Sequence, residues 1–275
     1  MRDALSGRVA IVTGASRGIG AAIAKRFAAE GASVAIVARS LDPGSGGHLP
    51  GSLAEVAGAI SLDGGTALPI VADLSDPACD RPGLVAKVTA ELGPVDIVVN
   101  NAAACFYLSV DETSERRLRV AYEVNVITPY LLVKAAVPRM RERGAGWIVN
   151  IGTVIAEPAR PGSGRRTGQF ARASTYGPSK AALNRLTEAF ADEFAGEGIA
   201  VNAVAPEMAV ATEGATAMME LPAEWLEPIE ALAEASLALA TCDPDVENGL
   251  VVKSLSYLRD HNRAIQSLDG RGPIA

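Results

Sequence analysis

The chain has 275 residues and a formal net charge of −7 at pH 7, and only 4% of its residues are aromatic, so its core must be built mainly from aliphatic side chains. The length suits one large domain or two small ones. The negative charge argues against nucleic acid and acidic membrane surfaces as partners. The cysteines lack metal-ligand spacing, and the two histidines, His48 and His261, lie far apart in the sequence, so we expect no metal site.

Localisation signals are scarce in this sequence. No apolar run approaches the roughly 18–20 residues that span a bilayer, so we expect no membrane partner. The N-terminus runs directly into a strand pattern, and we see no signal peptide. The three cysteines, Cys79, Cys105 and Cys242, are typical of reduced thiols. Together these features predict a cytoplasmic protein.

Strand-like and helix-like segments alternate along the whole chain. Short runs rich in Val, Ile and Ala predict strands at residues 9–12, 34–37, 67–72, 95–99, 147–151, 199–204 and 250–252. Helical patterns cover residues 21–30, 54–60, 78–92, 113–143, 176–195 and 226–240. This alternation predicts an α/β fold, a doubly wound parallel sheet of about seven strands with helices on both faces, in one domain that spans residues 1–275.

The turn after the first predicted strand is rich in glycine and reads Thr13-Gly14-Ala15-Ser16-Arg17-Gly18-Ile19-Gly20. Glycine lets such a turn tighten and lets the backbone approach a pyrophosphate, while the N-terminus of the next helix supplies unpaired N–H groups. A glycine-rich turn can also exist without a ligand. Its position between a strand and a helix favours dinucleotide binding.

The residues after the second predicted strand indicate which dinucleotide binds. An Asp or Glu usually holds the ribose hydroxyls there, whereas this chain has Ala38, Arg39 and Ser40. Arg39, together with Arg17 of the glycine turn, can bind a 2′-phosphate, because a planar guanidinium suits phosphate oxygens. The alternative is that both arginines are solvated surface side chains. We therefore expect NADP(H) as the preferred cofactor, with NAD(H) also possible.

Several distinctive residues lie at the carboxyl ends of predicted strands, where ligands of doubly wound sheets bind: Gly14, Arg39, Asp73, Asn101, Thr153 and Pro206. Asp73 either caps the next helix or holds an adenine amino group. Asn125 lies inside the long helical pattern at residues 113–143. It is either a satisfied polar residue of the core or a residue that bends the helix and orders a water.

Tyr176 opens a helical pattern, and Lys180 follows one turn later on the same face. A lysine cation beside a phenol favours the phenolate, so we expect the pKa of Tyr176 to fall from about 10 towards neutrality. Such a phenol exchanges a proton with an alcohol oxygen. Alone, this pair means little, because Tyr-x-x-x-Lys occurs by chance in many helices.

Two irregular segments border this pair. Residues 157–173 predict a mobile loop, and its four arginines suggest a second possibility, the binding of an anionic substrate group: Arg160, Arg165, Arg166 and Arg172. Residues 207–228 are rich in Met and predict a lid over an apolar pocket, although Met residues are more often plain core.

Taken together, the motifs resemble the short-chain dehydrogenase/reductase family over about residues 8–212. The motifs that match are the glycine turn, Asp73-Leu74, Asn100-Asn101-Ala102-Ala103, Asn125, Tyr176-x-x-x-Lys180 and Val201-Asn202-Ala203-Val204-Ala205-Pro206. Residues 48–51 and 64–69 further resemble the branch that contains hydroxysteroid-dehydrogenase-like and citronellol-dehydrogenase-like proteins. The resemblance implies a Rossmann fold and, commonly for this family, a homodimer or homotetramer.

The resemblance also implies roles for individual residues. Tyr176 would act as general acid or base, and Lys180 would lower its pKa and hold the nicotinamide ribose. Asn125 would anchor a proton-relay water, and Thr153 would take the place of the serine that binds the substrate oxygen. Cofactor binding is implied for Gly14, Ser16, Arg17, Gly18, Ile19, Gly20, Arg39, Ser40, Asp73, Leu74, Asn101, Ala102, Tyr176, Lys180, Pro206 and Thr212.

Three residues depart from the family pattern: Thr153 replaces serine, and Ala103 and Glu207 replace glycine. Glu207 would bring a carboxylate near the nicotinamide. The first hypothesis is an NADP(H)-dependent oxidoreductase that interconverts a small secondary alcohol and a ketone. The second is an NADP(H)-binding sensor or scaffold with little turnover. A third is an enzyme that uses the same pocket for epimerisation or enoyl reduction.

Overall fold

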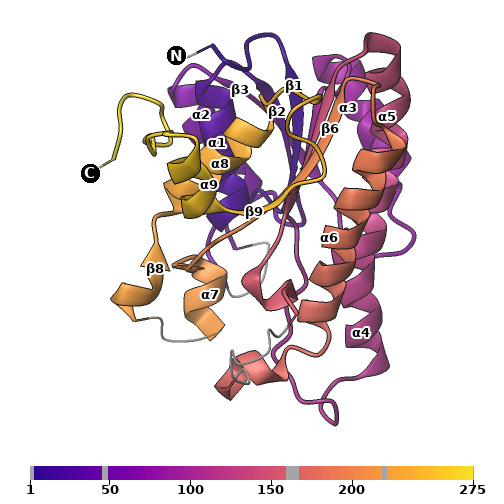
Figure 1. Ribbon diagram of the computed structural model, residues 1–275, viewed down its shortest axis with the longest axis vertical. Coiled ribbons are helices and arrows are strands. Elements are labelled where there is room, and N and C mark those ends of the chain that lie inside the picture. The colour runs from indigo at the N-terminus through magenta and orange to yellow at the C-terminus, as the bar shows by residue number, and fades with distance from the viewer. Residues whose placement is uncertain (1–2, 45–48, 159–166, 219–221, 275) are drawn as a thin grey trace.

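A seven-stranded parallel sheet forms the centre of the computed structural model, which describes residues 3–44, 49–158, 167–218 and 222–274 (Figure 1). The strand order is β3-β2-β1-β4-β5-β6-β9. The strands are β1 (Val9–Thr13), β2 (Ser33–Ala38), β3 (Thr66–Val71), β4 (Ile97–Asn100), β5 (Gly146–Ile151), β6 (Ile199–Ala205) and β9 (Val251–Lys253). The predicted doubly wound parallel sheet is therefore confirmed, with strand boundaries shifted by one or two residues.

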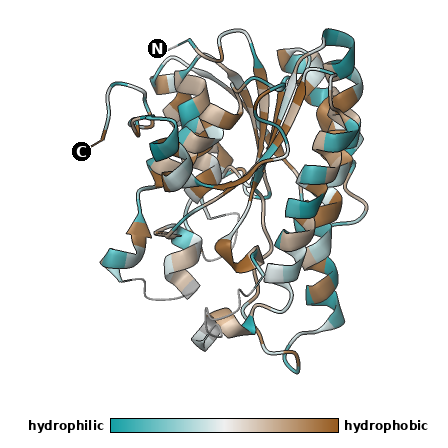
Figure 2. Cartoon of the chain, in the orientation of Figure 1, coloured by the Kyte–Doolittle hydropathy of each residue, from teal (hydrophilic) through white to brown (hydrophobic). Residues whose placement is uncertain are grey.

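Helices cover both faces of the sheet (Figure 1). One face carries α1 (Gly18–Ala29), α2 (Leu53–Leu62), α8 (Ile229–Leu239) and α9 (Ser254–Asp260). The other carries α3 (Arg81–Leu92), α5 (Thr128–Arg143) and α6 (Tyr176–Glu193). Figure 2 shows apolar residues concentrated in the strands and polar residues on the outer sides of the helices.

Alternate residues of the buried strands serve the two faces. In β1, Ala10 and Val12 join the apolar cluster that includes α1 and α8, whereas Val9 and Ile11 join the cluster that includes α3 and α5. A parallel strand covered on both faces needs a continuous apolar run, and this is why residues 9–12 are all aliphatic. The strand order reverses between β1 and β4, so a ligand cleft is expected at the carboxyl ends of these two strands.

The long helix predicted at residues 113–143 is interrupted. It consists of α4 (Glu115–Tyr122), a π-helical turn (Glu123–Ile127) and α5. Asn125 lies in the π-helical turn, which confirms the predicted irregularity. Such turns are rare and frequently occur at functional sites.

The helical span from Glu115 to Arg143 contradicts the expectation that no apolar run approaches the length of a bilayer. It is 29 residues long and, by length and composition alone, apolar enough to cross a membrane. From the sequence we expected no apolar run of this length. That expectation did not allow for polar residues within the run, such as Asn125 and Thr128. Half of its most apolar window is buried inside the domain, as in core helices of globular proteins, so this is weak evidence for a membrane span. The absence of a membrane partner remains a prediction.

The segment predicted as a lid begins and ends in a short parallel ladder. β7 (Ala209–Val210) pairs with β8 (Leu226–Glu227), and α7 (Glu213–Met218) and a 3₁₀ turn (Ala223–Trp225) lie between them. The remaining short elements are two 3₁₀ turns, Val154–Ala156 and Gly168–Arg172. Four residues named in the sequence analysis lie outside the described ranges, as do residues 219–221 of the predicted lid: His48, Arg160, Arg165 and Arg166.

A buried ionic network joins α1 to α8 and to the C-terminal segment. Arg26 Nη1 lies 2.6 Å from Glu30 Oε1, and Arg26 Nε lies 2.8 Å from Glu234 Oε2. Arg263 Nε lies 2.6 Å from the other oxygen of Glu234. The Arg26, Glu30 and Glu234 side chains are each at most 3% exposed, so these charges are compensated by one another and not by solvent.

Candidate active site

The segment after β4 packs directly on the glycine turn. Asn101 Nδ2 donates to the carbonyl oxygens of Thr13 (2.8 Å) and Gly14 (3.2 Å), and the Thr13 hydroxyl accepts from the backbone N–H of Ala102 (3.0 Å). A Cβ on Gly20 would lie 2.4 Å from Asn101 Nδ2, and one on Gly14 would lie 2.8 Å from the Cα of Ala102. These two glycines are therefore required by the neighbouring chain segment as well as by any approaching pyrophosphate.

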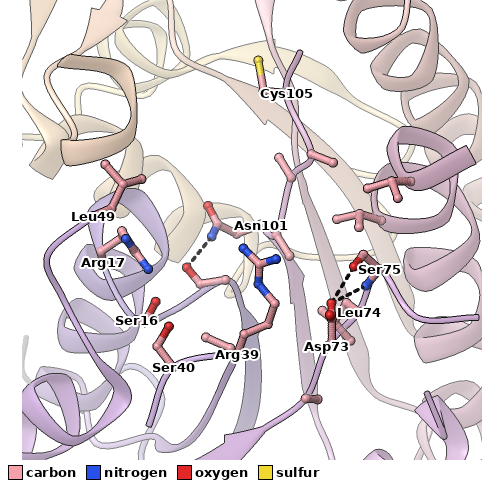
Figure 3. A pocket seen from close by; sticks show the side chains of 18 of the residues that line it. Ser16, Arg17, Arg39, Ser40, Leu49, Asp73, Leu74, Ser75, Asn101 and Cys105 are labelled. Atoms are coloured by element: carbon pink, nitrogen blue, oxygen red, sulfur yellow. Dashed lines mark hydrogen bonds between the residues drawn. The ribbon is translucent and has the colours of Figure 1, made fainter. Parts of the chain in front are cut away.

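A cleft of about 430 Å³ opens beside this contact, at the carboxyl ends of β1, β2, β3 and β4 (Figure 3). The structure brings nine of the predicted cofactor residues together in its lining: Gly14, Ser16, Arg17, Arg39, Ser40, Asp73, Leu74, Asn101 and Ala102. Ala103 also lines the cleft. Cys105 lies at the far end of the view, away from Ser40.

The remaining predicted cofactor residues flank this cleft. A Cβ on Gly18, whose φ is +52°, would lie 3.2 Å from the side chain of Thr212, so Thr212 packs on the glycine turn. Ile19 and Gly20 belong to the first turn of α1, and Pro206 directly follows β6. These positions are compatible with contacts to a dinucleotide, and none of them lines the cleft itself.

Two guanidinium groups make the cleft suitable for phosphate. Figure 3 shows Arg17 and Arg39 pointing into it, with the hydroxyls of Ser16 and Ser40 beside them. Nη1 of Arg17 is buried and has no hydrogen-bond partner among the described residues. A buried donor without a partner is costly, and an anion would relieve that cost. The residues present therefore fit a nicotinamide dinucleotide, including one with a 2′-phosphate.

Asp73 faces the same cleft and is exposed. Its Oδ1 accepts from the backbone N–H (2.9 Å) and the hydroxyl (2.7 Å) of Ser75. Partial burial acts to raise the pKa of Asp73, but the Ser75 hydrogen bonds and the charges of Arg39 and Arg81 outweigh it and lower that pKa. The carboxylate is therefore ionised at neutral pH, and of the two alternatives open from the sequence the contact with an adenine amino group stays a prediction.

Tyr176 lies at the start of α6, and Thr153 lies two residues beyond the end of β5. Burial raises the pKa of the Tyr176 phenol, the nearby Cys105 thiol raises it further, and hydrogen bonding to the Thr153 hydroxyl opposes both. The expected fall of this pKa towards neutrality is therefore wrong for the structure. The spacing of Tyr176 and Lys180 in the sequence does not show that the phenol is buried. Burial raises the pKa of the phenol by more than any neighbouring cation lowers it.

Lys180 is 1% exposed, and its Nζ donates to the backbone carbonyl of Ile151 at 2.8 Å. Burial lowers the pKa of Lys180 from 10.5 to about 8, and the Cys105 thiol acts weakly in the opposite direction. One of the three ammonium N–H bonds is thus directed at the end of β5. The ammonium is therefore anchored to the sheet.

Replacing Lys180 by Met is expected to raise the free energy of unfolding at pH 7 by up to roughly 3 kcal/mol, because a buried ammonium is removed. Below pH 8 both the folded and the unfolded chain carry this proton, and the folded chain bears the full burial cost. Between pH 8 and 10.5 Lys180 keeps its proton only in the unfolded chain. The free-energy cost of burying the ammonium therefore decreases as the pH rises. Urea unfolding of both proteins from pH 7 to 10 measures the difference. A Lys180→Met variant less stable than the parent at pH 7 would contradict this account.

The Asn125 side chain is satisfied within the protein. Its Oδ1 accepts from the N–H of Ala104 (2.9 Å), and its Nδ2 donates to the carbonyl of Ala104 (3.0 Å) and to the hydroxyl of Ser179 (2.9 Å). Of the two alternatives open from the sequence, the amide itself follows the first, a satisfied core residue, while the helix around it is irregular. Asn125 therefore joins three parts of the site: the segment after β4, the π-helical turn and α6.

Arg81 is a buried residue of the site that the sequence analysis missed. It is 1% exposed, and its guanidinium donates to the carbonyl of Leu74 (3.0 Å), to Glu123 Oε1 (2.7 Å) and to the hydroxyl of Thr128. The Thr128 hydroxyl in turn donates to the same Leu74 carbonyl (3.2 Å). These bonds tie the end of the cleft near Asp73 to the π-helical turn. The sequence around Arg81 is polar and rich in Pro and Asp, so no pattern indicates burial.

Glu207 does not point into the cleft, which corrects its expected position near the nicotinamide. Its carboxylate accepts from the backbone N–H (2.8 Å) and the hydroxyl (2.6 Å) of Ser256 in the first turn of α9. Glu227, at the other end of the same segment, accepts from the N–H of Glu207 (2.9 Å) and the hydroxyl of Ser254 (2.6 Å). We call these four residues the α9 clamp. Unpaired N–H groups at a helix start attract carboxylates, which explains the orientation of Glu207. Glu227 is held instead by the Ser254 hydroxyl and by the backbone N–H groups of Glu207 and Met208.

Comparison with known proteins agrees with this geometry. The model of the short chain dehydrogenase family matches residues 8–221. An uncharacterized oxidoreductase of Methylorubrum extorquens is 36% identical over 210 residues, which cover 76% of each chain. Human hydroxysteroid dehydrogenase-like protein 2 is 34% identical over 76% of this chain, which spans only 47% of that longer protein.

Two solved structures show the same architecture. The NADP-bound 3-oxoacyl (acyl-carrier-protein) reductase of Agrobacterium tumefaciens superposes with a TM-score of 0.74 at 29% identity, covering 90% of this chain and 93% of its own. A metagenomic short-chain oxidoreductase in complex with NADP gives 0.72 at 29% identity, covering 91% and 98%. The chain belongs to the short-chain dehydrogenase family. It is therefore an NAD(P)-dependent oxidoreductase of that family.

Proposed function

We propose that the chain is an NADP(H)-dependent oxidoreductase that interconverts a secondary alcohol and a ketone. The observation that carries this proposal is the position of the Tyr176–Thr153 hydroxyl pair beside Cys105, which lines a cleft that also contains a buried, unpartnered arginine donor. The cofactor supplies or accepts the hydride. The chain supplies binding, orientation and the proton.

In this proposal Tyr176 is the general acid for ketone reduction and the base for alcohol oxidation. Its high pKa keeps the phenol protonated at neutral pH, which suits proton donation to a ketone oxygen that gains negative charge. Thr153, whose hydroxyl acts to lower the pKa of the Tyr176 phenol, orients the substrate oxygen together with that phenol. Lys180, anchored to Ile151, keeps positive charge next to the forming alkoxide as long as it holds its proton.

The sensor or scaffold alternative predicts NADPH binding without turnover. The hydroxyl pair argues against it, because a protein that only binds a dinucleotide has no need of two hydroxyls that meet in a buried site. Loss of NADPH absorbance with a panel of aliphatic and aromatic ketones tests the choice directly. Tight NADPH binding together with no turnover across the panel would favour the alternative.

The cofactor preference rests on Arg17 and Arg39. Replacing Arg39 by Asp is expected to raise the KM for NADPH by about 10- to 100-fold, because a charge-assisted phosphate contact is replaced by repulsion. The KM for NADH is expected to change much less, so the preference shifts towards NADH. Steady-state kinetics with both cofactors measure the shift.

Arg139→Asp is the matched control for this charge reversal. Arg139 is 65% exposed near the end of α5 and pairs with Glu142. The control is expected to leave the ratio of the two KM values unchanged. An equal ratio in the parent and in Arg39→Asp would refute the assignment of the 2′-phosphate to Arg39.

We also propose a homo-oligomer. Leu118, Ile127 and Tyr130 expose large apolar side chains along α4, the π-helical turn and α5, at exposed fractions of 42%, 43% and 45%. Apolar groups gathered on a long helical surface favour burial against a second copy of the same surface.

A further inference from the structure

Three aromatic rings stand next to the catalytic hydroxyls, and the proposed function does not use two of them. The ring of Tyr107 meets that of Tyr176 edge to face, with centroids 6.2 Å apart and an interplanar angle of 69°. Phe170 meets Tyr107 at 6.0 Å and 90°. The rings come from three separate segments: the connection after β4, the 3₁₀ turn at Gly168–Arg172, and α6.

The segment that carries Tyr107 is held on both sides. Ala104 is fixed by two hydrogen bonds to Asn125. Leu108 forms a parallel β-bridge with Ala173, and Glu112 forms an ion pair with Arg172. Tyr107 is therefore held between the Asn125 amide on one side and, on the other, the described end of the segment predicted as a mobile loop.

The phenol of Tyr107 lies near the thiol of Cys105, which lines the cofactor cleft, and burial raises the pKa of both groups. The neighbouring thiol and phenol thus stay protonated and neutral at pH 7. The ring remains only half-buried, so part of its surface is free to contact a ligand.

We propose that Tyr107 is a specificity-determining residue that makes this site prefer ketones with an aromatic ring next to the carbonyl. A substrate oxygen bound at Tyr176 and Thr153 places its nearest substituent beside Tyr107. A planar aryl group makes edge-to-face contact with that ring, and such pairs gain a factor of about 2 to 12 over equal apolar area. A puckered saturated ring of the same size makes no such contact. This inference rests on the proposed function and names its substrate class.

The test compares acetophenone with cyclohexyl methyl ketone, which share a carbon skeleton and differ in aromaticity. The quantity measured is the ratio of their kcat/KM values with NADPH, in the parent and in variants, so that intrinsic reactivity cancels. Tyr107→Leu is expected to lower this ratio by about 3- to 10-fold, because the ring contact is lost. Tyr107→Phe keeps the ring and is expected to leave the ratio within about two-fold of the parent.

Phe194→Leu is the control for the loss of an aromatic ring. Phe194 directly follows α6, its ring stacks on Phe190, and it does not line the cleft. The same ratio in Tyr107→Leu as in the parent overturns the proposal. If Tyr107→Leu does not fold, Tyr107→Met, which keeps a long apolar side chain without a ring, is measured instead.

A second readout separates this inference from the proposed function. Dissociation constants of both ketones for the NADPH complex are measured by ligand-detected NMR in the parent and in Tyr107→Leu. If NADPH binds and neither ketone is reduced, the proposed function fails, and the binding ratio alone decides the role of Tyr107. The binding ratio is the affinity for acetophenone divided by the affinity for cyclohexyl methyl ketone. A fall of this ratio in Tyr107→Leu supports the role of Tyr107, and an unchanged ratio overturns it.

Discussion

Replacing Tyr176 by Phe is expected to lower kcat for ketone reduction by about 10²- to 10⁴-fold, the range that a positioned general acid contributes. Only the hydroxyl is lost, so the ring still packs edge to face with Tyr107. The affinity for NADPH, measured by nucleotide fluorescence, is expected to stay near that of the parent. Retained turnover in this variant would show that another group donates the proton.

A matched experiment on Thr153 distinguishes orientation from proton donation. Thr153→Ser keeps the hydroxyl that meets Tyr176, whereas Thr153→Val keeps the shape and loses the hydroxyl. We expect the Ser variant to retain most of the activity and the Val variant to lose most of it. Similar activity in both variants would mean that the Thr153 hydroxyl has no part in the reaction.

Replacing Glu234 by Ala is expected to lower the free energy of unfolding by roughly 3–5 kcal/mol, because the buried guanidinium of Arg26 loses its partner on α8. The carboxylate of Glu234 is 2% exposed and binds Arg26 and Arg263 through different oxygens, at 2.8 and 2.6 Å. Glu30, within 2.6 Å of Arg26, compensates only part of the loss. Urea unfolding followed by circular dichroism gives the change.

The control for this prediction is Glu188→Ala on α6. Glu188 is 50% exposed and pairs with Arg185 across 3.2 Å. Exposed pairs of this kind contribute about 0–1 kcal/mol, so the control is expected to change little. If Glu234→Ala also lowers the free energy of unfolding by less than about 1 kcal/mol, solvent or other groups compensate the charge of Arg26.

The sheet was predictable because its strands carry the signal in their own residues. Strands covered on both faces need unbroken aliphatic runs, and residues 9–12 and 147–151 show them directly. Helix α9 was missed, because its seven residues include Ser, Arg and Asp and its start is stabilised by Glu207, which is distant in the sequence. Local composition carries no trace of such a partner.

The cleft was predicted better than the chemistry inside it. Arg39 and Asp73 follow strands, so topology alone brings them to one edge of the sheet. The pKa of Tyr176 depends on desolvation, which is set by packing from several segments and not by the spacing to Lys180. Arg81 is bound mainly by backbone carbonyls and a hydroxyl, and residue types do not reveal such partners.

The roles of Tyr107 and Cys105 were missed for a related reason. They follow the Asn-Asn-Ala-Ala motif as part of an unremarkable apolar stretch, Ala104-Cys105-Phe106-Tyr107. Their place in the site becomes apparent only in the folded chain, where Leu108 pairs with Ala173, 65 residues later in the sequence. The aromatic pair Phe106-Tyr107, shortly after the Asn-Asn-Ala-Ala motif, was the one available hint.

The α9 clamp ties the segment predicted as a lid to the last part of the chain. Both ends of the segment between β6 and α8 are fastened to the same helix start, through Glu207 with Ser256 and Glu227 with Ser254. The excursion between these fixed points can therefore change in length or composition while the sheet and its cleft keep their shape. Shortening the protein from its C-terminus past Ser254 would remove both attachments of that excursion, although they lie some fifty residues beyond the end of β6.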